Sequence, residues 1–335
     1  MTIEVIKPGA LTTLQDLGRV GFQHFGVPVG GAMDEWSHCV ANVLVGNPKG
    51  EATLEITLTG PSLRFTEPAL IAITGGNLSP RIGEHTVPQE TPVLVRAGGR
   101  LDFGLRVAGV RAYLAIHGGF SVARVMGSKA TYVRGGFGGF DGRALRRGDA
   151  LRVDPGDVDR VYPTLVAMLR ASPLPFVTLE KGPKVPPAPS ASSPITVRVI
   201  PGQQWHAFSP EAQQSVREAQ FRLSPQSDRM GFRFEGPRLL LREPIEMISE
   251  AVAFGTIQVP PDGNPIVLMA DRQTTGGYPK IANVVSVDLP ILAQMMPQQG
   301  VRFTLISLDE AQQLYLARER LVADIAAQIN MLARR

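Results

Sequence analysis

The chain has 335 residues, 44% of them hydrophobic and 19% charged, and its formal net charge at neutral pH is only +4. This length allows one large or two ordinary domains with sizeable cores, while the scattered basic residues disfavour nucleic-acid binding. No apolar run approaches the roughly 20 residues that a membrane helix needs, so no membrane partner is expected. The 35 glycines and 28 prolines favour many short strands and turns over long helices.

Few classes of chemistry fit the reactive residues of the chain. The single cysteine, Cys39, excludes an internal disulfide framework and fits a reducing compartment. Residues 1–7 show no signal-peptide pattern, so the protein is expected to be cytoplasmic. The five histidines include no pair at helical or hairpin spacing, so no metal site is expected. A Gly-x-Ser-x-Gly elbow is also absent, which disfavours a serine hydrolase.

The first half is predicted to be strands and turns around one helix. Residues 2–6 alternate apolar and polar, as a strand does. A glycine-rich loop, residues 24–34, leads into a helix predicted over residues 33–45, with Asp34 as a candidate N-cap. This loop either holds an anion on its backbone N–H groups or is a structural turn, and it lacks the Gly-Lys-Ser/Thr ending of a nucleotide-binding P-loop. Strands and turns fill residues 54–153.

A Pro/Ser-rich stretch over residues 185–194 is the clearest linker in the chain. We therefore predict a first domain over 1–184 and a second over 195–335. The second half is predicted to contain strands over 195–200, 255–259 and 265–269, a helix over 210–219, and a long C-terminal helix with Asp309 as N-cap. Thr-Gly-Gly occurs at 74–76 and again at 275–277, which suggests that the two halves are related β-barrel-like domains.

Residues 271–280 carry the densest chemistry in the chain. They follow a buried strand and combine an acid, cations, hydroxyls and two glycines, which is typical of a loop that presents functional groups. Arg272 and Lys280 suit a carboxylate or phosphate, and backbone N–H groups at Gly276 and Gly277 suit an oxyanion. The alternative is a capped turn between two strands. The candidate catalytic residues are Asp271, Arg272, Lys280 and His24, and the candidate substrate-binding residues are Gln273, Thr274, Gly276, Gly277, Tyr278, Asp34 and Glu250.

Several blocks of the sequence match one known family. They are residues 15–19, 26–28, 30–34, 52–55, 227–231, 271–278 and Lys280. With them the chain resembles the family of 5-oxoprolinase C subunits, also described as Kip-inhibitor antagonists or as allophanate hydrolase subunit 2, a module that also occurs in the carboxyltransferase domain of biotin-dependent urea carboxylase. The resemblance runs from about residue 3 to about residue 305.

The resemblance implies two cyclophilin-like β-barrel subdomains. It also implies two partner chains, the Kip-inhibitor-like B subunit and the A subunit, with which the enzyme uses ATP to open 5-oxoproline to L-glutamate. Two alternatives remain open. One is the carboxyltransferase component of a biotin-dependent carboxylase, where biotin would be the cofactor. The other is a regulatory protein that antagonises a kinase inhibitor.

Overall fold

The computed structural model describes residues 1–154, 156–179, 185 and 195–332, and the fold is mainly β, as predicted. Its contacts divide the chain into two compact units. Unit 1 comprises Met1–Gly18, Asp34–Ala188 and Glu319–Arg335, and unit 2 comprises Arg19–Met33 and Pro189–Arg318. The predicted linker over 185–194 lies, apart from Val185, outside the described residues.

The units differ from the predicted halves in two segments, because each segment buries its apolar side chains in the other half's unit. Arg19–Met33 belongs to unit 2, where Met33 is fully buried in the hydrophobic core. Glu319–Arg335 belongs to unit 1, and its described part buries Ile325 and Ile329. A single cut at the linker therefore does not reproduce the two units. Each segment lies on one side of the linker in the sequence but belongs to the unit formed mainly by the other side.

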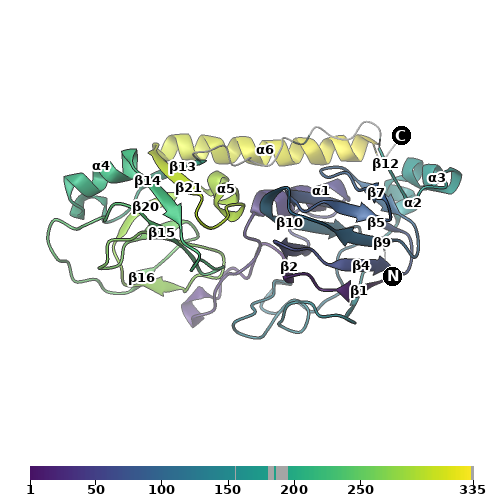
Figure 1. Ribbon diagram of the computed structural model, residues 1–335, viewed down its shortest axis with the longest axis horizontal. Coiled ribbons are helices and arrows are strands. Elements are labelled where there is room, and N and C mark those ends of the chain that lie inside the picture. Colours follow the sequence, from purple (N-terminus) through teal and green to yellow (C-terminus); the bar gives the residue numbers. More distant parts are fainter. Residues whose placement is uncertain (155, 180–184, 186–194, 333–335) are drawn as a thin grey trace. The chain divides into compact units, whose positions relative to one another are not determined.

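Unit 1 contains two six-stranded sheets with a shared core that includes Ile3, Leu54, Ile71 and Leu114 (Figure 1). One sheet has the order β11 (Ala150–Arg152), β1 (Thr2–Lys7), β4 (Ser62–Phe65), β9 (Arg100–Phe103), β6 (Pro80–Ile82), β7 (His85–Thr86). The other has the order β12 (Phe176–Thr178), β8 (Val93–Val95), β5 (Ala69–Asn77), β10 (Ala108–Ile116), β3 (Thr53–Thr57), β2 (Leu11–Gln15). The helices that lie wholly within this unit are α1 (Glu35–Leu44), α2 (Val158–Val161) and α3 (Pro163–Ala171).

Helix α1 packs on a sheet face that carries buried polar side chains. Asp34 caps the helix, as predicted, by accepting a hydrogen bond of 2.9 Å from the backbone N–H of Ser37. The Tyr113 hydroxyl donates to Glu55 at 2.8 Å, and His38 Nδ1 lies 2.9 Å from the Thr53 hydroxyl. Burial lowers the pKa of His38 from 6.5 to about 4, although the charges of nearby carboxylates oppose this shift.

The buried histidine makes the stability of the protein depend on pH. An unfolded chain takes up a proton at His38 below pH 6.5, whereas the folded chain does so only near pH 4, so stability is lost as pH falls between these values. We expect this residue alone to remove about 2 kcal/mol of unfolding free energy between pH 7 and pH 5. Urea unfolding at both pH values measures it, with His38→Gln as the comparison. Equal pH dependence in both proteins would contradict the assignment.

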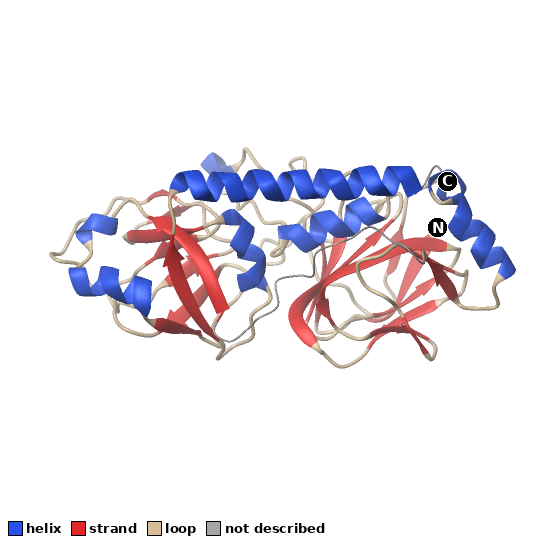
Figure 2. Ribbon diagram, turned by 90° about the horizontal axis from the view of Figure 1, so that it is seen from above, coloured by secondary structure: helices blue, strands red, loops and turns tan. Residues whose placement is uncertain are grey.

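Unit 2 is built on a closed seven-stranded barrel. Its strand order is β13 (Ile195–Pro201), β20 (Lys280–Val284), β17 (Thr256–Gln258), β18 (Ile266–Leu268), β15 (Gly231–Glu235), β14 (Gln220–Leu223), β21 (Gly300–Leu305). Strands β13 and β21 pair in parallel, and the interior holds Phe221, Phe234 and Phe303. The helices lie outside the strands in both units (Figure 2). In unit 2 they include α4 (Pro210–Glu218), α5 (Leu289–Ala293) and the 3-10 turns η1 (Gln23–Phe25), η2 (Trp205–Ala207) and η3 (Ser286–Asp288).

The repeated Thr-Gly-Gly occupies different structures in the two units. Thr74–Gly76 lies within the long strand β5, whereas Thr275–Gly276 forms the two-residue strand β19, which pairs with β16 (Glu250–Ala251) outside the barrel. The sequence echo therefore does not mark equivalent strands.

The C-terminal helix α6 (Leu308–Leu332) begins two residues earlier than the predicted Asp309 cap implies. Its cap is Ser307, whose hydroxyl accepts from the backbone N–H of Glu310 at 3.1 Å, while the Glu310 carboxylate accepts from the backbone N–H of Ser307 at 2.9 Å. This reciprocal arrangement is a capping box, and it replaces the predicted Asp309 cap because the serine has its glutamate partner three residues later.

Candidate functional site

Residues 271–280 connect the end of β18 to the start of β20, so the barrel fixes both ends of the stretch. Asp271, Arg272 and Lys280 are buried, with exposed fractions of 7%, 8% and 6%. Between them Gln273, Gly277 and Tyr278 are exposed. The stretch follows a strand end, as the sequence predicted, but its ionic groups are buried and its exposed side chains are uncharged.

Asp271 is held by an arginine that sequence reasoning had not placed in the site. Both of its carboxylate oxygens accept from Arg229, with Oδ2 to Nε at 2.8 Å and Oδ1 to Nη2 at 2.9 Å. Arg229 Nη2 also donates to the carbonyl of Gly31 at 2.6 Å. The predicted Gly30–Gly31 loop is therefore anchored to the barrel by this ion pair. Arg229 lies in the 227–231 block of the family resemblance, which was the available signal.

The same cluster explains why residue 30 is a glycine. Gly30 has a φ of +66°, and a Cβ there would lie 3.3 Å from Arg19 Nη1 and 3.6 Å from Asp271 Oδ1. A left-handed backbone and two close charged side chains both disfavour any larger residue. These contacts favour the alternative that the loop is a structural turn. The group of the loop that bonds to Arg229 is the Gly31 carbonyl, not a backbone N–H.

Arg272 contacts the protein's own backbone. Its Nε donates to the carbonyl of Val252 at 3.3 Å, its Nη1 donates to the carbonyl of Met269 at 3.4 Å, and its guanidinium carbon lies 5.8 Å from the centre of the Phe254 ring. These contacts tie the loop after β16 to the end of β18. They favour a role in shaping the site over direct ligand binding.

Lys280 and Glu250, separated by thirty positions in sequence, meet in the structure. Lys280 Nζ lies 2.5 Å from Glu250 Oε2, and the backbone N–H of Lys280 donates to Gln204 Oε1 at 3.0 Å. The lysine side chain is 7% exposed, whereas the Glu250 side chain is 41% exposed. The pair thus places a buried ammonium behind a solvent-accessible carboxylate, an arrangement that can bind an anion or orient a water molecule.

The backbone beside this pair requires a glycine at 276 because a neighbouring side chain lies close to it. Neither Gly276 nor Gly277 has a positive φ. Instead, Gly276 pairs with Glu250 in the small sheet, and a Cβ on it would lie 2.3 Å from Nε2 of the buried Gln258. Gln258 in turn donates to the carbonyl of Tyr278 at 3.4 Å. Close side-chain approach, not backbone conformation, is the constraint.

Gly276→Ala should therefore displace Gln258 or shift β19, at a cost of about 1–3 kcal/mol in unfolding free energy, as overpacking usually does. Gly277→Ala is the matched control, because a Cβ there meets only Ser249 Oγ at 3.4 Å, an ordinary contact. Thermal unfolding of both variants measures the difference. Equal melting temperatures would show that Gln258 moves aside freely.

Two predicted site residues lie elsewhere. Asp34 is in unit 1, where both carboxylate oxygens accept from Ser37 at the start of α1. His24 is exposed on η1, with its ring centre 3.8 Å from that of Phe25. Among the predicted residues, the structure brings together Lys280, Glu250, Gly276 and the exposed Gly277 and Tyr278 of the same stretch.

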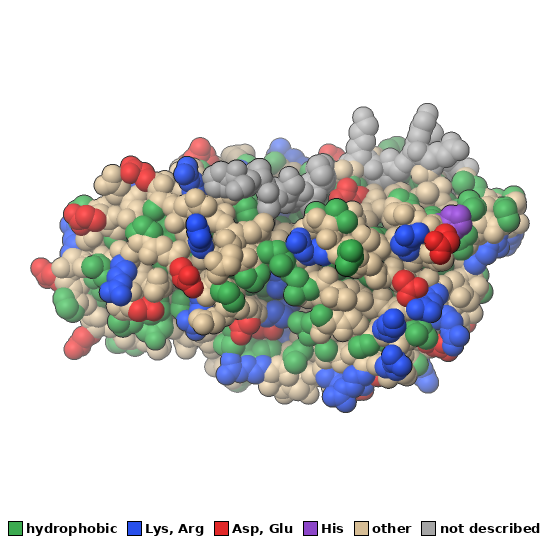
Figure 3. Space-filling view, viewed as in Figure 1, with side chains coloured by type: hydrophobic (Ala, Val, Ile, Leu, Met, Phe, Trp, Pro, Cys, Tyr) green, Lys and Arg blue, Asp and Glu red, His purple; other side chains and the backbone are tan. Residues whose placement is uncertain are grey.

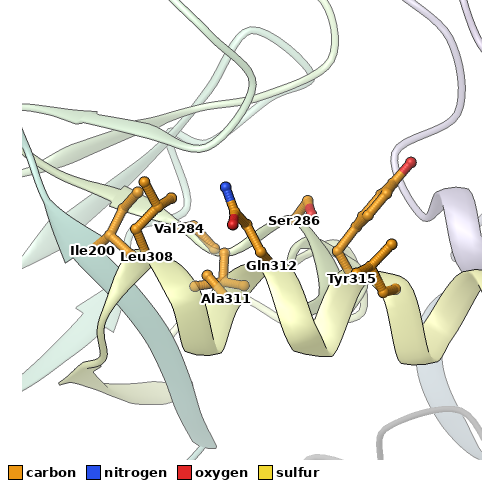
Figure 4. Close-up of a pocket in the computed structure, with 9 residues that line it drawn as sticks. Ile200, Val284, Ser286, Leu308, Ala311, Gln312 and Tyr315 are labelled. Carbon is orange, nitrogen blue, oxygen red and sulfur yellow. The ribbon is translucent and has the colours of Figure 1, made fainter.

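A separate cavity of about 390 Å³ lies between the first turns of α6 and the barrel (Figure 4). Its lining is mostly apolar and contains none of the predicted site residues; it is formed by Ile200, Val284, Val285, Ser286, Leu308, Ala311, Gln312, Tyr315 and Leu316. No acid–base pair faces it among these residues, so it does not compete with the Lys280–Glu250 region as a reaction centre. Among the described residues, no group of three or more His, Cys, Asp or Glu side chains could hold a metal ion, and no described helix is long and apolar enough to cross a membrane.

Known proteins resemble the chain along nearly its whole length. It is 34% identical over 328 residues to the 5-oxoprolinase C subunit of Haemophilus influenzae, covering 96% of this chain and 99% of the relative. The Escherichia coli protein of the same name is also 34% identical, covering 98% and 99%. The crystal structure of Kluyveromyces lactis urea carboxylase superimposes with a TM-score of 0.83 at 28% identity, covering 97% of this chain but only 29% of that one. Residues 25–305 match the family described as carboxyltransferase domain, subdomain A and B, and the chain belongs to that family.

Proposed function

We propose that this chain is the C subunit of a multi-chain, ATP-dependent 5-oxoprolinase that opens 5-oxoproline to L-glutamate. The observation that carries the proposal is the end-to-end match to two proteins named as C subunits of 5-oxoprolinase. Because the match covers nearly all of this chain and 99% of each relative, it favours the same role for this chain in its own assembly. The urea carboxylase structure shares the domain, but this chain matches only 29% of that much longer chain.

The reaction explains why ATP is a co-substrate. A five-membered lactam is a poor electrophile, and phosphorylation of its carbonyl oxygen converts that oxygen into a leaving group. Water can then add to the ring carbon, the carbon–nitrogen bond breaks as the nitrogen gains a proton, and a second water releases phosphate from the resulting acyl phosphate. The whole process consumes two waters and yields glutamate, ADP and phosphate.

Within this chain we assign the substrate side of the site to the Lys280–Glu250 pair. The buried ammonium suits the negative charge that forms on the lactam oxygen or on a transferred phosphoryl group. The accessible Glu250 carboxylate suits a water that must lose a proton. Neither residues 271–280 nor the anchored Gly30–Gly31 loop forms a P-loop-like cradle for a triphosphate, so we place ATP on a companion subunit.

Reconstitution tests the proposal. The purified chain is assayed alone and with homologues of the A and B subunits from the same genome, measuring ADP and glutamate released per 5-oxoproline added. We expect no turnover by the chain alone and stoichiometric ADP and glutamate from the complex. Turnover by the isolated chain would contradict the need for partners, and an inactive complete complex would contradict the assignment itself.

The second candidate is a carboxyltransferase component, supported by the family match and by the urea carboxylase structure. In that reaction the same ammonium and backbone donors would face the ureido oxygen of biotin. The biotin carrier would have to come from another chain, since no Ala-Met-Lys-Met-type motif occurs in this sequence. Carboxylation of urea by this chain with a biotin carboxylase and carrier, without 5-oxoproline turnover, would favour it.

A further inference from the structure

The positive charge of the chain is concentrated in one segment of unit 1. Residues 121–152 contain seven Lys and Arg residues against two acidic residues, whereas the net charge of the entire chain is +4. The rest of the chain is therefore slightly acidic, and the basic residues are not scattered as the composition suggested. A local excess of this size creates a field that attracts negatively charged partners.

Two of the seven basic residues serve the fold. Lys129 is buried, and its Nζ donates to Glu51 Oε1 and to the carbonyl of Phe120, both at 2.7 Å. Arg143 donates to both carboxylate oxygens of Asp149, at 2.7 and 2.9 Å, and this bonding lowers the pKa of Asp149. Their charges are offset within the unit.

The other five basic residues are exposed, and we call them the arginine surface: Arg124, Arg134, Arg146, Arg147 and Arg152. The segment's one exposed acid, Asp141, lies 3.2 Å from Arg143, and of the five arginines Arg124 lies 3.7 Å from Glu51, outside the segment. In Figure 3, Lys and Arg side chains, with acidic ones among them, are exposed on the face of unit 1 that carries β1 and β4, and Arg152 lies on β11, the strand that pairs with β1. This surface therefore carries an excess of positive charge toward the solvent.

The segment that carries these arginines is held in one conformation by the sheet beneath it. Backbone N–H groups of Thr131, Leu145 and Gly148 donate to carbonyls of β2 and β1 at 2.8–2.9 Å. Gly139 lies so close to the Thr131 hydroxyl that a Cβ would come within 1.9 Å of it. A preorganised surface loses little conformational entropy when a partner binds, which favours affinity.

Apolar side chains are exposed between the arginines. Met126 is 38% exposed and Val133 is 45% exposed. Arginine and methionine are enriched in protein–protein interfaces, whereas half to two-thirds of the hydrogen bonds to DNA go to phosphate and sugar and come largely from polar side chains. The mixture favours a folded protein with an acidic face over a nucleic acid.

We propose that the arginine surface docks an acidic face of a companion protein subunit. The inference rests on the proposed function for the identity of that companion, which is another chain of the 5-oxoprolinase assembly. Opposite charge across the interface speeds association and selects the partner, while the exposed Met126 and Val133 add apolar contact area.

The test is binding of the companion subunits to the double variant Arg146→Glu, Arg147→Glu. Both side chains are exposed, so the variant is expected to fold, which its melting temperature verifies. The control is Arg233→Glu, Arg302→Glu, which makes the same charge change at exposed positions of β15 and β21 in unit 2. Association and dissociation rates are measured by surface plasmon resonance at low and at high salt, and a labelled DNA duplex is tested in parallel.

We expect the Arg146/Arg147 variant to weaken binding by about tenfold or more, mostly through slower association, and to flatten its salt dependence, with the control unchanged. Equal weakening in both variants would overturn the docking surface in favour of a general charge effect. If the companion subunits bind the Arg146/Arg147 variant as tightly as the unchanged chain and the complex is active, the docking surface is wrong and the proposed function stands. Binding of DNA but of no companion would overturn it in favour of a nucleic-acid site, and reconstituted turnover would then decide the function separately.

Discussion

Replacing Asp271 by Ala is expected to lower the free energy of unfolding by about 3–5 kcal/mol, the largest effect on stability that we expect from one substitution in unit 2. The carboxylate is 7% exposed, and it is the bidentate partner of Arg229. Without it the Arg229 guanidinium, whose side chain is 12% exposed, loses its bidentate carboxylate in a largely buried place. The Gly30–Gly31 loop, anchored by Arg229, should loosen with it. Urea unfolding of the purified chain gives the magnitude.

Two further variants test whether the loss of stability comes from the Asp271–Arg229 ion pair or from the loss of any acidic side chain. Glu246→Ala, at an exposed position of the same unit, should change stability by no more than about 0.5 kcal/mol. The combined Asp271→Leu, Arg229→Met replacement removes both charges and should recover much of the loss, because two apolar side chains leave no unpaired ion. A double variant as unstable as Asp271→Ala would mean that the arginine's bond to Gly31, not the ion pair, dominates.

This expectation reassigns Asp271 from chemistry to structure. Its neighbours in sequence suggested a catalytic acid, since charged groups crowded at a strand end are a common active-site pattern. Spacing alone cannot show that its partner, forty-two positions earlier, is already in place. If the pair is structural, Asp271→Asn should lose stability and turnover in proportion.

Local features of the fold were predictable because they depend on neighbouring residues. The Asp34 cap, the helix after it and the strands at 195–200 and 265–269 all follow from short-range patterns and all occur in the structure. Closure of the barrel was not predictable in this way. It depends on the parallel pairing of Ile195 with Val301, and no local pattern specifies a contact at that separation.

The site shows the same division between local and distant information. The stretch at 271–280 was found from its composition, but the contact between Lys280 and Glu250 depends on β16 pairing with β19. The constraint on Gly276 likewise comes from Gln258 on another strand. Sequence patterns pointed to the stretch, and only the sheet pairing shows which of its residues lie beside Glu250.

Lys280→Met should lower turnover of the reconstituted enzyme by about a hundredfold or more while leaving the melting temperature nearly unchanged. Methionine keeps the buried stem, and Glu250, at 41% exposure, is hydrated when the ammonium is gone. The loss of rate follows because a positioned charge or proton-transfer group typically contributes about 10²–10⁴-fold. Glu250→Gln should reduce turnover similarly but also destabilise the chain, because it leaves the buried ammonium without its counter-ion.

Arg272→Met is the discriminating comparison for this pair. Its guanidinium bonds to backbone carbonyls of Val252 and Met269, so its loss should lower stability and reduce turnover only as far as the fold is disturbed. Steady-state rates and melting temperatures of the three variants, each assembled with its companions, separate the two roles. Near-normal turnover in Lys280→Met would remove the pair from the reaction and leave the exposed His24 region of η1 as the next place to test. We expect Lys280→Met to lose turnover at an unchanged melting temperature and Arg272→Met to lower the melting temperature. That result would place the chemistry at the accessible edge of the β16–β19 sheet and give Arg272 a supporting role in the fold.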